Sequence, residues 1–333
     1  MQSILLIRLT SLGDVILASG LVRQLKGAFP DAAIDVAVDS RFADVWSHNP
    51  RVRSVYAIDR QVRTNSELSA VAAQAPYDLV VDLQKNRRSK QIIASLQLPA
   101  ASQVVCINKH RWEKLALVWL KRRPRVVTPI TKRYWNTVRD LRVMYDEAGP
   151  EVWSADDASG VHPIAKCIGV APGARHATKR WTTQGYAELV RHLVADNQEN
   201  VILLGGPDDV TICDEIESLA NVPVMRADGA RNLAQTLAAL DRCRLVVSND
   251  SALMHLARAR RIPVVAIFGS TVQELGFAPS GADVRIVERD GLPCRPCSHI
   301  GRDRCPKGHF RCMNEITSGE VAAAVDSLLS MAP

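Results

Sequence analysis

The chain has 333 residues and a formal net charge of +7; 47% of its residues are hydrophobic and only 5% are aromatic. This length allows two domains with cores of ordinary size. No apolar run is long enough to span a bilayer, and Met1 leads directly into a strand, so we expect a soluble cytoplasmic protein without a signal peptide. The positive charge favours an anionic partner, such as nucleic acid, acidic lipid or a phosphorylated small molecule. The few aromatic residues weigh against single-stranded nucleic acid.

The first half of the chain alternates strands with helices, the pattern of an α/β domain. The predicted strands cover residues 3–9, 33–39, 52–58, 77–83 and 102–107. The predicted helices cover residues 14–28, 67–75 and 134–147, a further helix begins at 41, and a polar turn covers 84–90. Residues 149–163 are polar and rich in turn formers, which indicates a linker to a second domain.

The second half repeats the pattern. The predicted strands lie within residues 167–173, 200–206, 244–248 and 262–269, and the helices within 182–196, 208–220, 231–243, 249–261 and 317–329. Thr317 and Glu320 have the spacing of a capping box. We therefore predict an α/β protein with two doubly wound Rossmann-like domains, residues 1–160 and 161–333, that face a central cleft. Ligands of such sheets bind outside the carboxyl ends of the strands.

One polar loop follows the first strand. Gly13 allows close approach of the backbone, and Asp14 opens the next helix. A first-turn carboxylate suits the helix dipole, so capping alone explains an aspartate there. The alternative is a reactive carboxylate that points into a cleft.

Three further loops follow strands of the second half. The loop 172–181 gathers cations that suit a phosphate, namely Arg175, His176, Lys179 and Arg180. In "LLGGPDD", Asp208 and Asp209 either contact a ribose or cap a helix after a tight turn. In "VVSNDSALMHLA", Asn249 or Asp250 is predicted to cap a helix whose free amides can bind an anion. Ser251 and His255 share one face of that helix.

Four of the eight cysteines are clustered, with the spacing C-x2-C-x7-C-x6-C: Cys294, Cys297, Cys305 and Cys312. In a cytoplasmic chain such a cluster favours a metal over disulfides. Thiolate ligation would suit a closed structural zinc or iron site. The alternative is four reduced thiols in a loop.

These motifs together resemble a known family. "LIRLTSLGDVILASGLVRQLK", "PGARHATKRWT", "LLGGPDD" and "VSNDSALMHLARARRIPVVAIFGST" strongly resemble the ADP-heptose:lipopolysaccharide heptosyltransferases, glycosyltransferase family 9, of the heptosyltransferase II-like kind. The resemblance covers nearly the whole chain and is weakest between residues 109 and 162. It implies the two-domain GT-B fold, an inverting reaction without a catalytic metal, an acceptor on the N-terminal domain and a nucleotide sugar on the C-terminal domain.

The resemblance also implies roles for single residues. Asp14 is expected to be the general base that takes the proton of the acceptor hydroxyl as the oxygen attacks the anomeric carbon. Lys179, Ser251 and the free amides beside Ser251 are expected to stabilise the leaving diphosphate, and Asp250 to bind sugar hydroxyls. The full set of predicted donor-binding residues is Lys179, Arg180, Asp250, Ser251, Ala252, His255, Asp208 and Asp209. Many relatives have glycine where this chain has Ala252, whose methyl group narrows the approach to the phosphate.

Two basic segments are open to more than one interpretation. The predicted turn 84–90 offers Lys85, Arg87, Arg88 and Lys90 either to a phosphorylated lipopolysaccharide core and lipid A or to solvent alone. The segment 109–125, "KHRWEKLALVWLKRRPR", either lies on an anionic membrane or grips the lipid acceptor, or else packs on the domain as an amphipathic helix. Some relatives that modify autotransporters carry an iron site of four cysteines, whose spacing need not be equivalent.

We therefore predict a cytoplasmic heptosyltransferase, peripheral to the inner face of the inner membrane, that uses ADP-heptose and a lipopolysaccharide acceptor, with no cofactor for catalysis and no nucleic-acid partner. The nearest alternative is a GT-B enzyme with another nucleotide sugar or a protein acceptor, including a nucleotide-sugar 2-epimerase. A second alternative is a basic, metal-stabilised protein that binds nucleic acid. A third is a non-catalytic relative, for which Ala252 is the only hint.

Overall fold

The computed structural model describes residues 1–59, 71, 76–124, 126–158 and 166–331. The chain forms two compact units: residues 1–109 with 130–155, and residues 110–129 with 156–333. The predicted boundary after residue 160 falls among residues outside the described ranges. The segment 110–129 belongs to the second unit, whereas its position in the sequence placed it in the first domain. Buried Leu117 explains this, because it packs with Val272 and Leu275 of the second unit.

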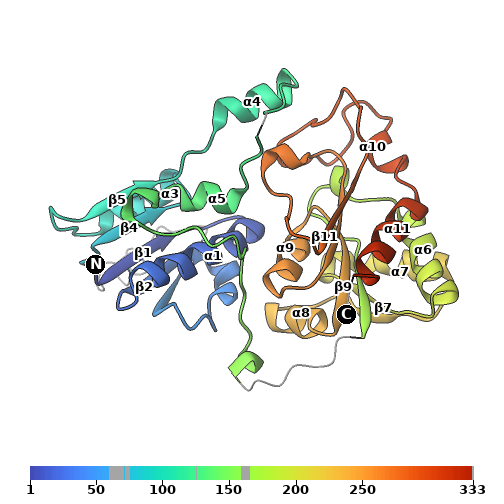
Figure 1. The fold of residues 1–333 in the computed structure, drawn as a ribbon, viewed down its shortest axis with the longest axis horizontal. Helices are drawn as coiled ribbons and strands as arrows, with labels where there is room; N and C mark the ends of the chain where they lie inside the picture. Colours follow the sequence, from blue (N-terminus) through green and yellow to red (C-terminus); the bar gives the residue numbers. More distant parts are fainter. Residues whose placement is uncertain (60–70, 72–75, 125, 159–165, 332–333) are drawn as a thin grey trace. The chain divides into compact units, whose positions relative to one another are not determined.

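The first unit has a five-stranded parallel sheet in the order β3-β2-β1-β4-β5 (Figure 1). Its strands are β1 (Ser3–Ile7), β2 (Ala33–Asp39), β3 (Ser54–Ile58), β4 (Leu79–Asp82) and β5 (Gln103–Cys106). Its helices are α1 (Leu12–Ala28), α3 (Arg87–Ser95) and α5 (Ile130–Trp135), with 3-10 turns at Ser40–Val45 and Arg139–Leu141. Leu5 and Ile7 of β1 and Val80 of β4 are fully buried in one cluster with Ile92 of α3.

The second unit has a six-stranded parallel sheet in the order β11-β10-β9-β6-β7-β8. Its strands are β6 (Cys167–Ala171), β7 (Asn200–Leu204), β8 (Met225–Ala227), β9 (Cys243–Asn249), β10 (Val264–Phe268) and β11 (Val284–Glu288). Its helices are α4 (Arg111–Trp119), α6 (Thr183–Arg191), α7 (Val210–Ala220), α8 (Leu233–Leu240), α9 (Ala252–Ala259), α10 (Arg311–Asn314) and α11 (Ser318–Leu329). Helix α6 packs against α7 and α11, and α9 packs against β9 and β10.

Both sheets have a switch point at which the strand order reverses. It lies between β1 and β4 in the first unit and between β6 and β9 in the second. The connections leaving two neighbouring strands go to opposite faces at such a point, so a crevice opens at the carboxyl edge of the sheet. The predicted site loops follow these four strands, except for the loop with Asp208 and Asp209, which follows β7. The α/β class and the doubly wound architecture are therefore confirmed.

Several predicted elements differ from the structure. Residues 87–95 form helix α3, and only its start was included in the predicted turn 84–90; the Asn86 side chain caps it by accepting the Ser89 N–H at 3.0 Å. Strands β8 and β11 were not predicted, because they are short or border long loops. The segment after residue 41 belongs to the 3-10 helix Ser40–Val45 and is not an α-helix. The predicted helix 67–75 lies outside the described residues except for residue 71.

The predicted helix 134–147 is wrong. Helix α5 ends at Trp135, one 3-10 turn follows, and residues 142–154 are irregular. The chain is held there by Arg23 of α1, which contacts Asp146 Oδ2 at 2.7 Å and Glu151 Oε2 at 3.0 Å through its side chain. Its Nη2 also donates to the Gly149 carbonyl at 2.8 Å. These long-range bonds outweigh the local helical pattern.

None of the helices within the described ranges is long and apolar enough to cross a membrane.

Candidate functional site

Asp14 lies at the switch point of the first sheet, in the first turn of α1. The helix begins at Leu12 after the N-cap residue Ser11. Asp14 Oδ2 accepts hydrogen bonds from the Ser11 backbone N–H at 3.2 Å and from its hydroxyl at 2.9 Å. The carboxylate is thus a cap, as the simpler interpretation of the sequence holds. One of its oxygens remains for other contacts.

That second oxygen, Oδ1, is shared by Arg8 and Tyr134. Arg8 Nη2 lies 2.5 Å from it, and the Tyr134 hydroxyl donates to it at 2.9 Å. Burial alone would raise the pKa of Asp14, but the Arg8 charge and the hydrogen bonds from Arg8 and Ser11 lower it, and the net shift is downward. Burial raises the pKa of Tyr134 well above its usual value; the Arg8 charge opposes this rise, and the charge and hydrogen bond of Asp14 add to it. At neutral pH the site therefore holds an ionised carboxylate beside a neutral phenol.

The loops after β1 and β4 are tied together by Gln84. Its Oε1 accepts the backbone N–H groups of Leu9 at 3.0 Å and Thr10 at 3.1 Å. Buried Asp82, at the end of β4, accepts the N–H groups of Gln84 at 2.9 Å and Lys85 at 2.7 Å. These bonds fix the backbone on both sides of the switch point.

The four predicted acceptor cations lie at the start of α3 and just before it. Lys85, Arg87 and Lys90 are exposed, while Arg88 is half-buried. Arg88 Nη2 donates to the Asp59 carbonyl at 2.8 Å, and its Nη1 lies 3.4 Å from Asp39 Oδ2. Arg88 is therefore occupied by contacts within its own unit. The other three can reach an anionic ligand.

In the second unit, Lys179 lies in the loop after β6 and Asp250 directly follows β9, the two strands that flank the switch point. Lys179 Nζ lies 2.6 Å from Asp250 Oδ2, and the Thr271 hydroxyl donates to the same oxygen at 2.7 Å. Asp250 is buried, and its backbone N–H donates to the Ile267 carbonyl. The loops after β6, β9 and β10 thus meet at one carboxylate.

Asn249 joins two of these loops through its backbone partners. Its Nδ2 donates to the Pro172 carbonyl at 2.7 Å, and its Oδ1 accepts the Trp181 N–H at 3.0 Å. The predicted cap at Asn249 or Asp250 is wrong, because β9 runs through Asn249 and Ser251 is the N-cap residue of α9. The Ser251 hydroxyl lies 3.2 Å from that of Ser248, so it does not satisfy the first amides of α9.

Ala252 opens α9, and His255 is buried one turn later. The helix N-terminus therefore presents amide groups at the switch point, where an anion binds favourably. The side chain of Arg180 turns back on its own loop, because its Nε donates to the Ala174 carbonyl at 2.8 Å. Arg175 is exposed.

The two aspartates after β7 have different surroundings. Asp209 Oδ2 accepts the Gly206 N–H at 2.9 Å, so this residue caps the turn. A Cβ atom on Gly173 would lie 2.2 Å from Asp209 Oδ1, so only glycine lets the loops after β6 and β7 approach this closely. Asp208 is exposed. The capping interpretation therefore fits Asp209, and Asp208 is available to a ligand.

The cysteine segment packs on the loop that carries Lys179. The Thr178 N–H and hydroxyl both donate to the Arg302 carbonyl at 3.0 Å, and the Cys297 N–H donates to the Ser270 carbonyl at 3.2 Å. Buried Arg295 adds hydrogen bonds to the Thr271 carbonyl at 2.9 Å and to Glu288 at 2.5 Å. The segment therefore supports the loops of the switch point.

Metal ligation by the four cysteines stays a prediction. All four are free and lie within the described residues, where no group of three or more Cys, His, Asp or Glu side chains can hold a metal ion. Cys294 Sγ lies 3.8 Å from His309 Nε2. Burial raises the pKa of Cys297, and raises that of Cys312 to about 11, so both stay protonated near neutral pH. The predicted metal ligation thus gains no support from the structure.

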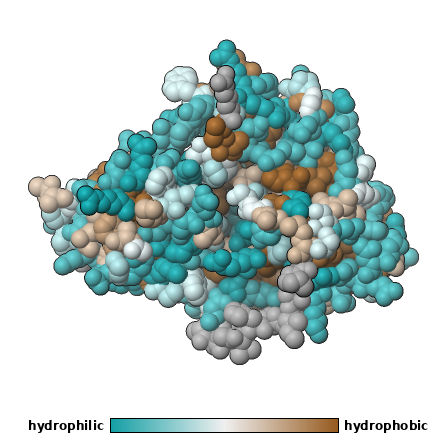
Figure 2. Space-filling model, viewed as in Figure 1, coloured by the Kyte–Doolittle hydropathy of each residue, from teal (hydrophilic) through white to brown (hydrophobic). Residues whose placement is uncertain are grey.

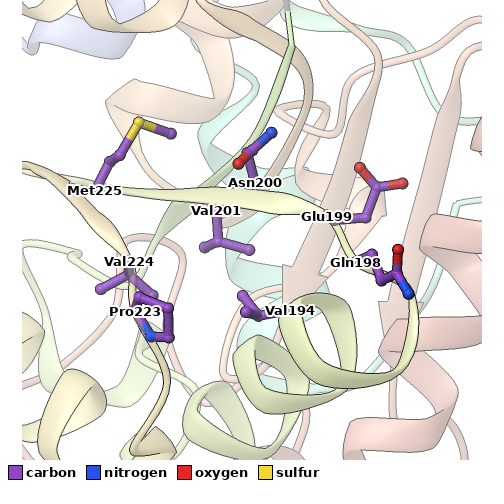
Figure 3. Close-up of a pocket in the computed structure, with 8 residues that line it drawn as sticks. All are labelled: Val194, Gln198, Glu199, Asn200, Val201, Pro223, Val224 and Met225. Atoms are coloured by element: carbon purple, nitrogen blue, oxygen red, sulfur yellow. The ribbon is translucent and has the colours of Figure 1, made fainter.

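A hollow of about 430 Å³ lies elsewhere in the second unit, between the residues before β7 and those before β8. Val194, Val201, Pro223 and Val224 surround it, with Gln198 and Glu199 beside it (Figure 3). These residues lie at the amino edge of the sheet, opposite to the loops described above. The hollow is therefore not part of the candidate site.

Comparison with known proteins identifies the family. The model of glycosyltransferase family 9 (heptosyltransferase) matches residues 73–305. This chain belongs to glycosyltransferase family 9. The glycosyltransferase is 25% identical to lipopolysaccharide heptosyltransferase 3 of Escherichia coli, with 95% of this chain and 96% of that protein aligned. It is 24% identical to lipopolysaccharide heptosyltransferase 2 of Salmonella typhimurium, with 99% of each aligned.

The fold of the glycosyltransferase agrees with this assignment. The solved structure of E. coli ADP-heptose lps heptosyltransferase II superposes with a TM-score of 0.73 at 21% identity and covers 99% of both chains. The two parallel sheets are those of the GT-B fold, as predicted. The family also removes the nucleic-acid-binding alternative, whose support was the charge and the cysteine cluster.

Sequence reasoning missed several residues at the site of this glycosyltransferase. Tyr134 and Arg8 contact Asp14, Thr271 contacts Asp250, and Gln84 joins two loops. Thr271 directly follows the "VVAIFGS" strand and turn, and a polar residue after a strand is a signal that could have found it. Tyr134 had no such signal, because it lies on a helix 120 residues away from Asp14.

Proposed function

We propose that this glycosyltransferase transfers heptose from ADP-heptose to the inner core of lipopolysaccharide, onto a Kdo or heptose residue, with inversion at the anomeric carbon. Its place is the cytoplasm, peripheral to the inner face of the inner membrane, where the lipid A part of the acceptor is anchored. The names of its relatives, lipopolysaccharide heptosyltransferases 2 and 3, support this donor and acceptor. The observation that carries the proposal is the pair of polar switch points, one with a carboxylate and one with a lysine beside a helix N-terminus.

Asp14 is the proposed base. It is ionised at neutral pH, so it can accept the proton of an acceptor hydroxyl. A carboxylate of lowered pKa is a weak base toward an alcohol, so proton transfer must accompany attack. The acceptor oxygen forms the new bond to the anomeric carbon as the bond from that carbon to the diphosphate oxygen breaks. Arg8 and Tyr134 hold the carboxylate in one orientation.

The loops of the second unit supply the donor site. Lys179, Ser251 and the amides that open α9 would stabilise the charge that develops on the departing diphosphate. Asp250 would accept hydrogen bonds from sugar hydroxyls, with Lys179 and Thr271 fixing its orientation. Ala252, His255 and Arg180 would line or support the same site. Exposed Asp208 would contact the ribose, whereas Asp209 holds the turn beside it.

Lys85, Arg87 and Lys90 would bind the phosphates of the acceptor, since they are exposed and share one edge of the first sheet. Arg88 would position α3 through Asp39. The proposed transfer uses only these groups of the chain. A structural zinc or iron at Cys294, Cys297, Cys305 and Cys312 stays a prediction that metal analysis of the purified protein would test.

The test measures ADP release from ADP-heptose, with and without lipopolysaccharide acceptors truncated at different depths of the core. We expect release that depends on one acceptor, and a loss of about 10²–10⁴-fold in turnover for Asp14→Asn. Asp31→Asn is the matched control, because Asp31 is an exposed carboxylate of the same unit. Near-normal turnover by a folded Asp14→Asn protein would contradict the role of the base. Turnover only with another nucleotide sugar or a protein acceptor would replace the proposed substrates.

A further inference from the structure

Helix α4 turns large apolar side chains to solvent. Trp112 is 84% exposed and Trp119 is 74% exposed, and Leu115 between them is also exposed. Their spacing of three and four residues places all three on one face of the helix. Figure 2 shows pale and brown side chains among teal ones in the part of the surface that α4 occupies in Figure 1. A contiguous apolar face of this kind is uncommon on a surface that meets only water.

The apolar face continues beyond the helix and is accompanied by positive charge. Leu120 and Val126 are exposed as well. Residues 109–125 contain seven lysines and arginines and a single glutamate, Glu113. His110 Nδ1 contacts the Glu113 carboxylate. Exposed Arg111 lies at the start of the helix and exposed Arg122 just beyond its end.

The other side of α4 is fixed to the second unit. Leu117 is buried against Val272 and Leu275. Lys121 Nζ donates to the Pro296 carbonyl at 2.6 Å and to the Cys294 carbonyl at 3.3 Å. Arg123 pairs with Glu274 at 3.0 Å. These contacts hold one face of the helix against the second unit, so the tryptophans stay on the opposite, solvent-exposed face.

We propose that α4, residues 120–124 and Val126 dock on the surface of an anionic lipid bilayer. Nine residues make a helix of about 14 Å, too short to span a bilayer but suited to lie in its interface. Tryptophan favours the interface because its ring is apolar and its N–H can still reach water. The surrounding cations are complementary to anionic headgroups. The inference deepens the proposed function and rests on its lipid-anchored acceptor.

Co-sedimentation of the full chain with vesicles tests the proposal. The probes are vesicles of phosphatidylethanolamine and phosphatidylglycerol and, for comparison, vesicles of phosphatidylcholine alone. We expect binding to the anionic vesicles that weakens with salt. The double variant Trp112→Ser/Trp119→Ser should bind at least about tenfold more weakly, and Arg111→Gln/Arg122→Gln about fivefold more weakly for each charge removed. The matched control Met144→Ser/Leu219→Ser removes exposed apolar side chains elsewhere and should bind like the native chain.

Three results would overturn the docking. They are equal binding by the native chain and the tryptophan variant, no binding by the native chain to anionic vesicles, and loss of self-association rather than of vesicle binding in the tryptophan variant. The last result would assign the face to a second copy of the chain. Turnover with a water-soluble core oligosaccharide separates this proposal from the proposed function. If the native chain turns over the soluble acceptor but does not bind vesicles, only the docking proposal is refuted. If it binds vesicles but turns over no acceptor, only the proposed function is refuted.

Discussion

Asp14 is held by three groups that differ in what they do to it. Ser11 binds one carboxylate oxygen as a helix cap, while Arg8 and Tyr134 bind the other. Arg8 stabilises the ionised form by charge and Tyr134 by a hydrogen bond. The cost is a weaker base. The gain is a carboxylate that is already ionised and oriented when an acceptor arrives, which is the condition for a concerted proton transfer.

Tyr134→Phe should separate these contributions. The ring and its packing stay, but the hydroxyl that donates to Asp14 at 2.9 Å is lost. Because that bond favours the carboxylate, its loss should raise the pKa of Asp14. The acid limb of kcat/KM should move to higher pH by up to about one pH unit. An unchanged pH profile with an intact fold would show that Tyr134 only fills space.

At the scale of elements, the donor site depends on how closely strand-end loops approach one another. The loop after β6 contacts the turn after β7 where Gly173 meets Asp209, and Thr178 of the same loop is bound to the cysteine segment. The loop after β10 reaches Asp250 through Thr271. The loops contact one another, so a displacement of one passes to the next. The closest approach, at Gly173, is the most sensitive to added volume.

Gly173→Ala should therefore disturb the donor site. The new methyl group would collide with the Asp209 carboxylate, which cannot move without leaving the Gly206 N–H. We expect a loss of about 1–3 kcal/mol in the free energy of unfolding of the second unit and weaker ADP binding, both measured by thermal melting with and without ADP. Asp209→Ala in the same chain should recover part of the loss in stability.

Gly27→Ala in α1 is the control for that substitution, because a Cβ there meets nothing within 4 Å. It should leave stability unchanged or increase it slightly, since alanine favours a helix. Equal effects of the two substitutions would contradict the argument from the close approach.

At the scale of the whole molecule, titratable groups that are buried or paired with an opposite charge set the pH range of stability. Burial alone would raise the pKa of Asp39 and of Asp146. Hydrogen bonds, chiefly from Arg41 to Asp39 and from Arg23 to Asp146, lower the pKa by more than burial raises it, so the net shift is downward. Such groups stabilise the fold above the pKa of the unfolded chain, about 4, and this stability is lost as the pH falls through the lower folded pKa. Burial raises the pKa of the Cys213 and Cys243 thiols to about 12, so stability also falls between about pH 9 and 12.

Asp39→Asn tests the acid side of this range. The buried Asp39 carboxylate binds Arg41 at 2.7 Å and lies 3.4 Å from Arg88, so the variant should lose about 1–3 kcal/mol of stability near pH 7. The difference from the native chain should narrow as the pH falls below about 4 toward the lowered pKa of folded Asp39, because Asp39 of the unfolded native chain is protonated there. Amide hydrogen exchange of β2 across this pH range measures it. Asp140→Asn changes an exposed carboxylate and should leave the stability unchanged at each pH. A stability difference for Asp39→Asn that does not vary with pH would contradict the link between the protonation of Asp39 and stability.

The sequence by itself determined the α/β class, the two doubly wound sheets and the strand ends that carry Asp14, Lys179 and Asp250. Hydrophobic period and turn chemistry are local properties, so they can be read along the chain. The tertiary structure alone decided that Tyr134 reaches Asp14, that residues 142–154 leave the helical pattern, and that α4 belongs to the second unit. These features depend on contacts between residues far apart in the chain, where packing overrides local preference.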